Sequence, residues 1–302
     1  MTASTENCIT FEGSLPNRRL EGVWESIVGV EKIKEQLANQ ALLSLGLRAQ
    51  LPFSACALHG LILLHGDPGT GKTTLARGLG QEIAPLVKGG SVRLIEVNPH
   101  GLMSADHGQS QQRVTELLCE DIPLRADDGR PTIVLVDEVE SMVVARSAAS
   151  LEANPADVHR ATDAVLMALD RNAHEHPHLL MVATSNFTES LDEAFRSRAD
   201  LTIEVPRPNA AGILKILSET LADFGKVYPK LNDLAASPRL RAVATALDGF
   251  DGRRVRKVIT EALAAQRKTV LDPNALEADD LLAAAKRLAA REEIKENYLE
   301  AA

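Results

Sequence analysis

The sequence predicts an α/β domain followed by a smaller, entirely helical domain. Five short, nearly continuous apolar runs alternate with helical patterns in the first two thirds of the 302-residue chain. That alternation is typical of a parallel sheet covered by helices on both faces. After the break "PRPN", only helical patterns remain. We therefore expect a flexible arm at residues 1–20, an α/β domain with a parallel five-stranded sheet at 21–206, and a helical domain at 207–302.

Each expected element follows from its own stretch of sequence. The strands are mainly apolar runs of five or six residues, as expected for strands buried on both faces: Leu61–His65, Val92–Val97, Thr132–Asp137, Leu179–Thr184 and Leu201–Val205. Helical patterns lie between most of them, for example at Lys72–Ile83, Arg113–Cys119 and Ala161–Leu169. The helices expected in the second domain are Ala210–Phe224, Arg239–Leu247, Arg253–Thr269 and Glu277 to about Leu299.

Composition narrows the class of protein. Apolar residues make up 45% of the chain, charged residues 25%, and the net charge is −9, which argues against nucleic acid as a main partner. Cys8, Cys56 and Cys119 form no CxxC pair, so neither a zinc site nor a disulfide framework is indicated. No apolar run approaches 18 residues, and the first residues do not resemble a signal peptide. We expect a cytoplasmic protein without a membrane span.

The stretch "GDPGTGKTT" follows the first apolar run and opens a helix. Gly66, Gly71, Lys72 and Thr73 fit the phosphate-loop pattern G-x-x-x-x-G-K-[ST]. Backbone N–H groups of such a loop fold around phosphates, the lysine reaches the β- and γ-phosphates, and the hydroxyl binds Mg²⁺. A chance Gly-rich turn is the alternative, and the flanking strand and helix argue against it. The predicted ATP-binding residues of this loop are Asp67, Pro68, Gly69, Thr70, Gly71, Lys72, Thr73 and Thr74.

Acidic residues end a later apolar run, in "IVLVDEVES". Carboxylates at the C-terminal end of a parallel strand lie where such sheets bind ligands. Asp137 is predicted to hold Mg²⁺ together with Thr73, and Glu138 to orient and deprotonate the attacking water. Taken alone, the pair could equally be a solvated acidic turn. Beside a phosphate loop, the catalytic interpretation is favoured.

Three weaker signals lie further along the chain. Asn186 follows the next apolar run, so it could face the γ-phosphate, although asparagine is also common in turns. Arg196 and Arg198, in "AFRSRAD", could stabilise transition-state charge, or form a surface charge pair. Arg253, in "DGRRVRK", could reach nucleotide from the second domain, or belong to a solvated basic face.

The order of these motifs resembles an AAA+ ATPase from about residue 22 to residue 300. More narrowly, the chain is similar to the pachytene-checkpoint family, which includes the thyroid-receptor-interacting ATPase of animals and remodels HORMA-domain proteins. The phosphate loop is not specific to this family, whereas the other segments that carry the resemblance are more specific to it. They read "LIEVNPHGLMS", "LVDEVESMVVARS", "NPADVHRATDAVLMALD", "ATSNFTESLDEAFRSRADL" and "DGRRVRK".

The resemblance implies roles for individual residues. Ile27, Val28 and Gly29 match the segment that packs near adenine. Arg198 matches a finger that acts in trans on the nucleotide of the neighbouring subunit, with Arg196 as a second candidate, and Arg253 matches the sensor arginine of the helical lid domain. A trans finger requires a ring, and the family forms homo-hexamers. The family's cofactors are ATP and Mg²⁺.

The resemblance also places a substrate-gripping loop in the central pore at 104–110, where the family usually carries aromatic residues. Here Asp106 and His107 stand in those places, and Met103 is the nearest bulky apolar residue. Only about twenty residues precede the ATPase core, as in the short bacterial members. Those accompany HORMA proteins and second-messenger synthases in anti-phage signalling.

We therefore predict a hexameric ATPase that opens a HORMA-domain protein. Two alternatives stay open in the same superfamily: a remodeller of the Rubisco-activase type, which "DEVES" and "RAD" fit less well, and a DNA-associated loader, which the acidic balance disfavours. A nucleotide-dependent switch with little hydrolysis is a third, and the presence of both Glu138 and Arg198 argues against it.

Overall fold

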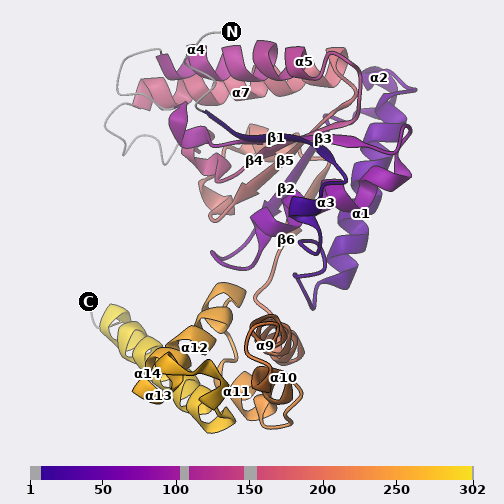
Figure 1. Ribbon diagram of the computed structural model, residues 1–302. Helices are drawn as coiled ribbons and strands as arrows, with labels where there is room; N and C mark the ends of the chain where they lie inside the picture. The colour runs from indigo at the N-terminus through magenta and orange to yellow at the C-terminus, as the bar shows by residue number, and fades with distance from the viewer. Residues whose placement is uncertain (1–7, 103–108, 146–154, 301–302) are drawn as a thin grey trace. The chain divides into compact units, whose positions relative to one another are not determined.

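The computed structural model describes residues 8–102, 109–145 and 155–300 of the chain. By its internal contacts the chain divides into two compact units. The first consists of residues 1–66 and 71–205, and the second of residues 67–70 and 206–302 (Figure 1). The first unit is an α/β structure built around a sheet, and the second consists of helices.

A six-stranded sheet with the order β1-β3-β4-β5-β2-β6 forms the centre of the first unit. The five strands from β3 to β6 in this order are all parallel, which confirms the predicted parallel sheet. The strands are β1 (Ile9–Leu15), β2 (Leu61–His65), β3 (Val92–Val97), β4 (Thr132–Val136), β5 (Leu179–Ser185) and β6 (Leu201–Glu204).

Helices cover both faces of the sheet, as Figure 1 shows. Successive side chains of a strand point to opposite faces, so each strand contributes to two cores. In β2, Ile62 and Leu64 pack with α1 (Glu31–Arg48) and α3 (Lys72–Ile83), whereas Leu61 and Leu63 belong to the opposite core. That second core is closed by α4 (Gln109–Glu116), the π-helical turn η5 (Leu117–Asp121), α5 (Ile122–Arg125) and α7 (Pro155–Glu175).

Shorter elements connect the strands of the first unit. They are α2 (Phe53–Cys56), α8 (Glu193–Ser197) and the 3-10 turns η2 (Arg18–Leu20), η3 (Ala84–Leu86), η4 (Pro99–Gly101), η6 (Val139–Ser141) and η7 (Thr188–Ser190). Of these, η4, η6 and η7 follow β3, β4 and β5 directly. They therefore lie along the carboxyl edge of the sheet, where parallel α/β folds bind their ligands.

Strand β1 corrects two expectations. Residues 9–15 are not part of a flexible arm but pair antiparallel with β3, so the sheet has a sixth strand at its edge. The segment "ITFEGSL" alternates: Thr10, Glu12 and Ser14 are exposed, whereas Phe11 and Leu15 pack against the core that contains α1 and α3. Such alternation is typical of a strand with one solvated face, and that pattern differs from the continuous apolar runs of the five parallel strands.

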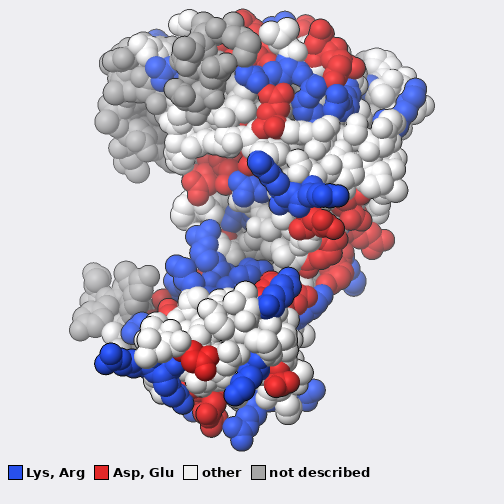
Figure 2. Space-filling model, in the orientation of Figure 1, with Lys and Arg blue, Asp and Glu red and all other residues white. Residues whose placement is uncertain are grey.

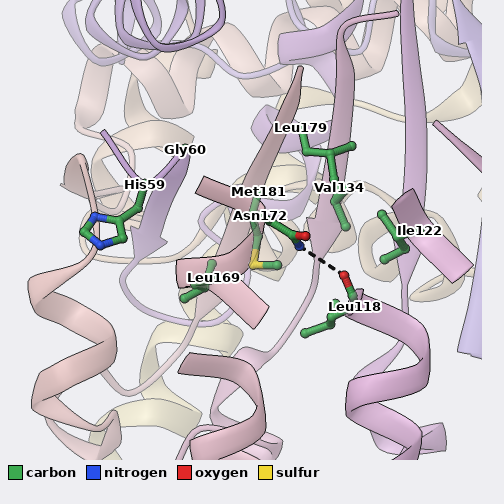
Figure 3. A pocket seen from close by; sticks show the side chains of 9 residues that line it. All are labelled: His59, Gly60, Leu118, Ile122, Val134, Leu169, Asn172, Leu179 and Met181. Carbon is green, nitrogen blue, oxygen red and sulfur yellow. Dashed lines mark hydrogen bonds between the residues drawn. The ribbon is translucent and has the colours of Figure 1, made fainter. Parts of the chain in front are cut away.

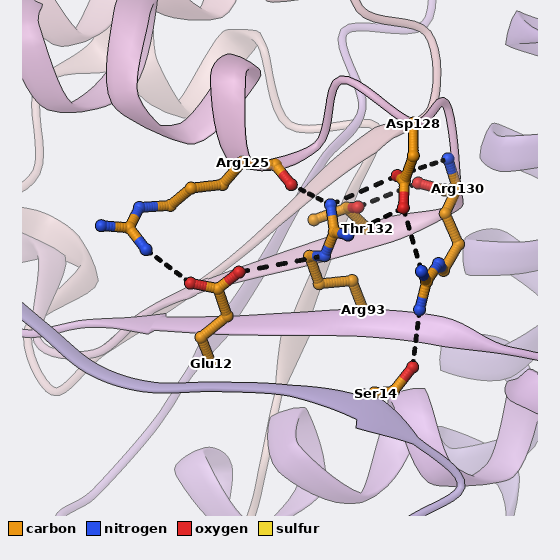
Figure 4. A network of polar contacts seen from close by, with 7 residues as sticks. All are labelled: Glu12, Ser14, Arg93, Arg125, Asp128, Arg130 and Thr132. Atoms are coloured by element: carbon orange, nitrogen blue, oxygen red, sulfur yellow. Dashed lines mark hydrogen bonds and ion pairs between the residues drawn. The ribbon is translucent and has the colours of Figure 1, made fainter. Parts of the chain in front are cut away.

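A network of charged side chains fastens β1 to the rest of the sheet (Figure 4). Arg125 donates to Glu12 at 2.6 Å (Nη1 to Oε2), and Arg130 donates to Ser14 at 2.7 Å (Nη1 to Oγ). Arg93 of β3 connects these two contacts, because its guanidinium donates to the backbone carbonyl of Arg125 and to Asp128. The polar face of β1 therefore has specific partners, as its apolar face does.

The second unit contains only helices among its described residues. They are α9 (Ala210–Gly225), α10 (Lys230–Ala235), α11 (Leu240–Ala246), α12 (Gly252–Ala264), α13 (Arg267–Leu271), η8 (Pro273–Ala275) and α14 (Ala278–Glu300). The expected single helix at 253–269 is in fact two helices, because the chain breaks at Gln266, whose backbone is extended. Thr269 stabilises the break, since its hydroxyl lies within hydrogen-bonding distance of the carbonyls of Leu263 and Gln266, one on each side of the junction.

The apolar character of the helices and the distribution of surface charge can be compared with the composition. Among the described residues, none of the helices has the length and apolar character needed to cross a bilayer. On the face drawn in Figure 2, basic and acidic side chains are interspersed over both units.

Leu15 tests whether β1 belongs to the folded core. It is 1% exposed, and a Cβ added at Gly80 of α3 would lie 2.5 Å from its Cδ1, so the two elements are in close contact. Leu15→Ala is expected to lower the free energy of unfolding by about 2–5 kcal/mol because it leaves a cavity. Urea unfolding followed by fluorescence of Trp24, the only tryptophan, reports this core. The exposed Leu124→Ala is the control. Equal effects of the two variants would contradict the account.

Candidate nucleotide-binding site

The phosphate loop joins the end of β2 to the start of α3. Gly71 adopts φ +101°, a conformation that favours glycine, and a Cβ at this position would also displace the terminal Cδ1 of Ile27, 2.6 Å away. Lys72 is 6% exposed, and its ammonium group donates to the Gly66 carbonyl at 2.7 Å and to Asn186 Oδ1 at 2.8 Å. The lysine predicted to bind phosphate is therefore buried and held between the loop and the end of β5.

The middle of the loop, residues 67–70, groups with the second unit. Asp67 Oδ2 accepts from Arg207 Nε at 2.7 Å, and the same guanidinium donates from Nη1 to the Gly249 carbonyl at 2.7 Å. Thr70 is buried, and its hydroxyl donates to the Asp67 carbonyl. No motif in the sequence indicates a partner for Asp67.

The predicted metal ligands lie next to each other. Thr73 Oγ1, in the first turn of α3, donates to Asp137 Oδ1 at 2.7 Å. Thr184 of β5 donates to the same oxygen, and its own hydroxyl accepts from the Glu138 N–H at 3.1 Å. Thr184 thus joins the neighbouring strand ends and fixes the turn that follows β4. This role was missed, because a threonine inside an apolar run carries no visible motif.

Glu138 has an unusual backbone. Its φ is +54° and its ψ +53°, the left-handed region that costs a residue other than glycine about 1–3 kcal/mol and that is found most often at functional sites. The side chain is half exposed, and its Oε2 lies 3.0 Å from His100 Nε2. His100 belongs to η4, after β3, and it lines an open groove together with Thr73, Asp137 and Glu138. No sequence pattern marks His100 as a functional residue.

Asn186 follows β5 directly and lies next to Lys72 of the phosphate loop. Its side-chain oxygen accepts from Lys72, and its backbone N–H donates to Glu140 Oε1 at 3.0 Å. Glu140 therefore positions Asn186 from the turn after β4. Glu140 belongs to the motif "DEVES", but the motif pattern predicts catalytic roles only for Asp137 and Glu138.

The two finger candidates have different surroundings. Arg198 ends α8, and its Nε and Nη2 donate to the two carboxylate oxygens of Asp170 at 2.7 and 2.8 Å. This hydrogen-bonded pairing lowers the pKa of Asp170, although partial burial of the carboxyl opposes the shift. Arg196 is exposed and lines a shallow groove with Glu189 and Glu193.

The remaining predicted residues are placed as follows. Ile27 and Val28 are buried, Gly29 is exposed with φ +80°, and Thr74 is half-buried on α3. Arg253 lies in the first turn of α12, in the second unit, so its approach to nucleotide stays a prediction. The predicted pore-loop residues Met103, Asp106 and His107 lie outside the described residues.

The donor set suits Mg²⁺ bound together with phosphates. A hydroxyl and a carboxylate are hard oxygen ligands, and Mg²⁺ in nucleotide sites takes one or two protein ligands with the rest from phosphates and water. Thr73 and Asp137 supply that pair. Among the described residues, no group of three His, Cys, Asp or Glu side chains could hold a metal ion. That finding is compatible with an ion held jointly with ATP.

A second cavity lies away from these residues, between the sheet and the helices of the other core (Figure 3). It is apolar and has room for about one water molecule. Asn172 donates from Nδ2 to the Leu118 carbonyl at 3.0 Å, while its buried Oδ1 has no partner among the described residues. This cavity is too small for a nucleotide, so the carboxyl edge of the sheet remains the candidate site.

Comparison with known proteins agrees with this geometry. The model of the "ATPase family associated with various cellular activities (AAA)" matches residues 62–207. CD-NTase-associated protein 6 of Pseudomonas aeruginosa is 45% identical over 273 residues, 90% of each chain. The Pachytene checkpoint protein 2 homolog of Danio rerio is 32% identical over 277 residues, which cover 84% of this chain and 65% of that protein.

Two solved structures share the fold. PCH-2 of C. elegans superposes with a TM-score of 0.72 at 24% identity, over 92% of this chain and 75% of that one. A chain of the E. coli MS115-1 HORMA:CdnC:Trip13 complex superposes with a TM-score of 0.72 at 17% identity, over 94% and 97%. Fold and site together define an AAA ATPase. Within that class the chain belongs to the family of the Pachytene checkpoint protein 2 homologs, and it is also homologous to CD-NTase-associated protein 6.

The roles of Glu138 and Lys72 can be separated by measurement. Glu138→Gln is expected to keep ATP binding and to lower hydrolysis by about 10²- to 10⁴-fold, because it loses only the base that acts on water. Lys72→Ala is expected to weaken ATP binding itself, because it removes the buried cation of the loop. Nucleotide titration measures the affinity for ATP, and phosphate release measures the rate of hydrolysis. The exposed Glu189→Gln is the control. The same loss of affinity in both variants would show that the roles are assigned wrongly.

Proposed function

We propose that this protein is a homo-hexameric, cytoplasmic ATPase that uses ATP hydrolysis to open a HORMA-domain protein and thereby regulates anti-phage second-messenger signalling. The observation that supports this most is the 45% identity with CD-NTase-associated protein 6, which extends over 90% of both chains. The resemblance therefore covers more than a shared ATPase core. A structural relative is named as part of a complex with a HORMA protein and CdnC.

The site residues suggest how hydrolysis would proceed. Lys72 would neutralise charge on the β- and γ-phosphates, and Thr73 and Asp137 would hold Mg²⁺ beside them. Glu138 would take a proton from the attacking water, with Asn186 helping to orient it. In the described structure Lys72 and Thr73 already contact Asn186 and Asp137, so these groups need little rearrangement to surround a triphosphate.

Completion of the site would require a neighbouring subunit. Arg198 of that subunit would reach the γ-phosphate and stabilise the charge of the transition state, and Arg253 of the same chain would contact the nucleotide from the helical unit. An arginine that acts in trans makes turnover depend on assembly. It would therefore link hydrolysis in each subunit to its contacts in the ring.

The grip on the substrate is proposed to come from the loop that contains Met103, Asp106 and His107. Without an aromatic residue, the flexible thioether of Met103 can pack against varied side chains, and His107 can hydrogen-bond a peptide carbonyl. Such a grip suits a brief pull on a short terminal segment of a HORMA protein better than the threading of a whole domain.

Release of a labelled peptide from a closed HORMA-domain protein of the same cell tests the proposal. The wild-type protein with ATP is expected to release the peptide, and Glu138→Gln is expected not to, since it binds ATP without turnover. Met103→Ala and His107→Ala are expected to release less peptide per ATP hydrolysed. Met167→Ala, at an exposed methionine of α7, is the matched control.

Two results would contradict the proposal. Peptide release by Glu138→Gln at the wild-type rate would show that hydrolysis does not drive opening. ATP turnover stimulated by DNA but not by any HORMA protein would favour a DNA-associated loader instead. Wild-type release by both loop variants would leave the ATPase assignment intact and would remove only the assigned grip.

A further inference from the structure

The guanidinium of Arg198 is held at three points. Nε and Nη2 donate bidentate hydrogen bonds to the carboxylate of Asp170 at 2.7 and 2.8 Å, and Nη1 donates to the Ala194 carbonyl at 2.8 Å. Asp170 lies on α7 and Arg198 ends α8, so this contact joins two elements that are 28 residues apart in sequence. The Arg198 side chain is 23% exposed and that of Asp170 46% exposed.

The backbone beside Arg198 is fixed as well. Asp200, two residues further on, accepts from the backbone N–H groups of His59, Gly60 and Leu61 at 2.9, 2.8 and 3.3 Å. These N–H groups belong to the start of β2 and the residues before it. The segment "RAD" is thus attached to the sheet through its aspartate while its arginine is attached to α7.

Arg196 provides an internal comparison. It lies two residues before Arg198 and is exposed, and among the described residues no hydrogen bond or ion pair holds its side chain. A long side chain without such contacts samples many rotamers. Only Arg198 therefore has the fixed orientation that transition-state stabilisation in a neighbouring site requires.

We propose that Asp170 is the positioning residue of Arg198 for catalysis in the neighbouring subunit. This inference rests on the proposed function, because it requires a ring in which Arg198 acts in trans. An arginine has five N–H donors, and the three contacts use one hydrogen each of Nε, Nη1 and Nη2. Two N–H donors of Arg198 remain for phosphate oxygens while its hydrogen bonds to Asp170 stay intact. Asp170 itself never touches the nucleotide.

The expected effect of Asp170→Ala is a fall in ATP turnover of about 10²-fold with unchanged ATP affinity, the size of loss that misplacing a reacting group produces. Arg198→Ala, the reference variant, is expected to lose about 10³- to 10⁵-fold. The double variant Asp170→Ala/Arg198→Ala should be no worse than Arg198→Ala alone, because the aspartate acts only through the arginine. Asp170→Glu, which keeps the carboxylate, should restore part of the turnover.

Mixed rings separate positioning from a structural role. The pocket of an Asp170→Ala subunit is intact and its finger is misplaced, whereas a Lys72→Ala subunit has a defective pocket and an intact finger. Mixing the two is expected to recover turnover, as mixing Arg198→Ala with Lys72→Ala should. A fold defect in Asp170→Ala would not be repaired by a neighbour. Glu175→Ala, which breaks an exposed Glu–Arg pair on the same helix, is the matched control and should turn over normally.

The inference is overturned if Asp170→Ala turns over at the wild-type rate, or if it is not rescued in mixtures that do rescue Arg198→Ala. Thermal unfolding of each variant shows which losses come from misfolding, and Asp170→Asn, similar in size to aspartate, provides a second test where Asp170→Ala fails to fold. If Arg198→Ala itself is not rescued, the trans finger is absent. In that case the hexameric mechanism of the proposed function fails together with this inference.

Discussion

The hydrogen bond between Thr73 and Asp137 is the contact on which the candidate site depends. It joins the first turn of α3, the helix that follows β2, to Asp137, the residue directly after β4, and β2 and β4 are separated by β5 in the sheet order. Parallel strands end at the same edge, so Thr184 and Asn186 of the intervening region come within hydrogen-bonding distance of this pair and of Lys72. The position of every predicted catalytic group of the first unit follows from that shared edge, except that of the arginines.

The sheet holds these groups at some energetic cost. Glu138 is kept in a left-handed conformation directly after β4, and its N–H is satisfied by Thr184. Lys72 is buried with acceptors around its ammonium group. Such strain and burial persist only where the surrounding packing is well determined, and here two apolar cores enclose the strands from both faces. The packing that stabilises the two cores therefore also holds the site residues in their positions.

The sequence predicted the features that depend on local pattern. Strands buried on both faces appear as continuous apolar runs, and the helix Lys72–Ile83 was predicted with its observed bounds. The spacing of the phosphate loop identified Lys72 and Thr73 because their roles follow from adjacent residues. Strand β1 was missed because its alternating pattern differs from that of the parallel strands, and the break at Gln266 was missed because helix periodicity continues across it.

What the sequence could not predict are partners made by tertiary folding. Nothing in the stretch around Asp170 indicates that it meets Arg198, and nothing near His100 indicates Glu138. Thr184 and Glu140 likewise act through residues that only the sheet brings near. The motif residues are recognisable because the residues that define each motif lie together in one short segment. The supporting residues, in contrast, acquire their role from strand register and topology.

We propose above all that the carboxyl edge of this sheet binds ATP together with Mg²⁺. Calorimetric titration of ATP, with and without Mg²⁺, into the wild-type protein and into Asp137→Asn tests it most directly. Mg²⁺ is expected to strengthen ATP binding to the wild-type protein and to do so far less for Asp137→Asn, which loses the charge on the carboxylate proposed to face the metal. An equal effect of Mg²⁺ on both proteins would contradict it.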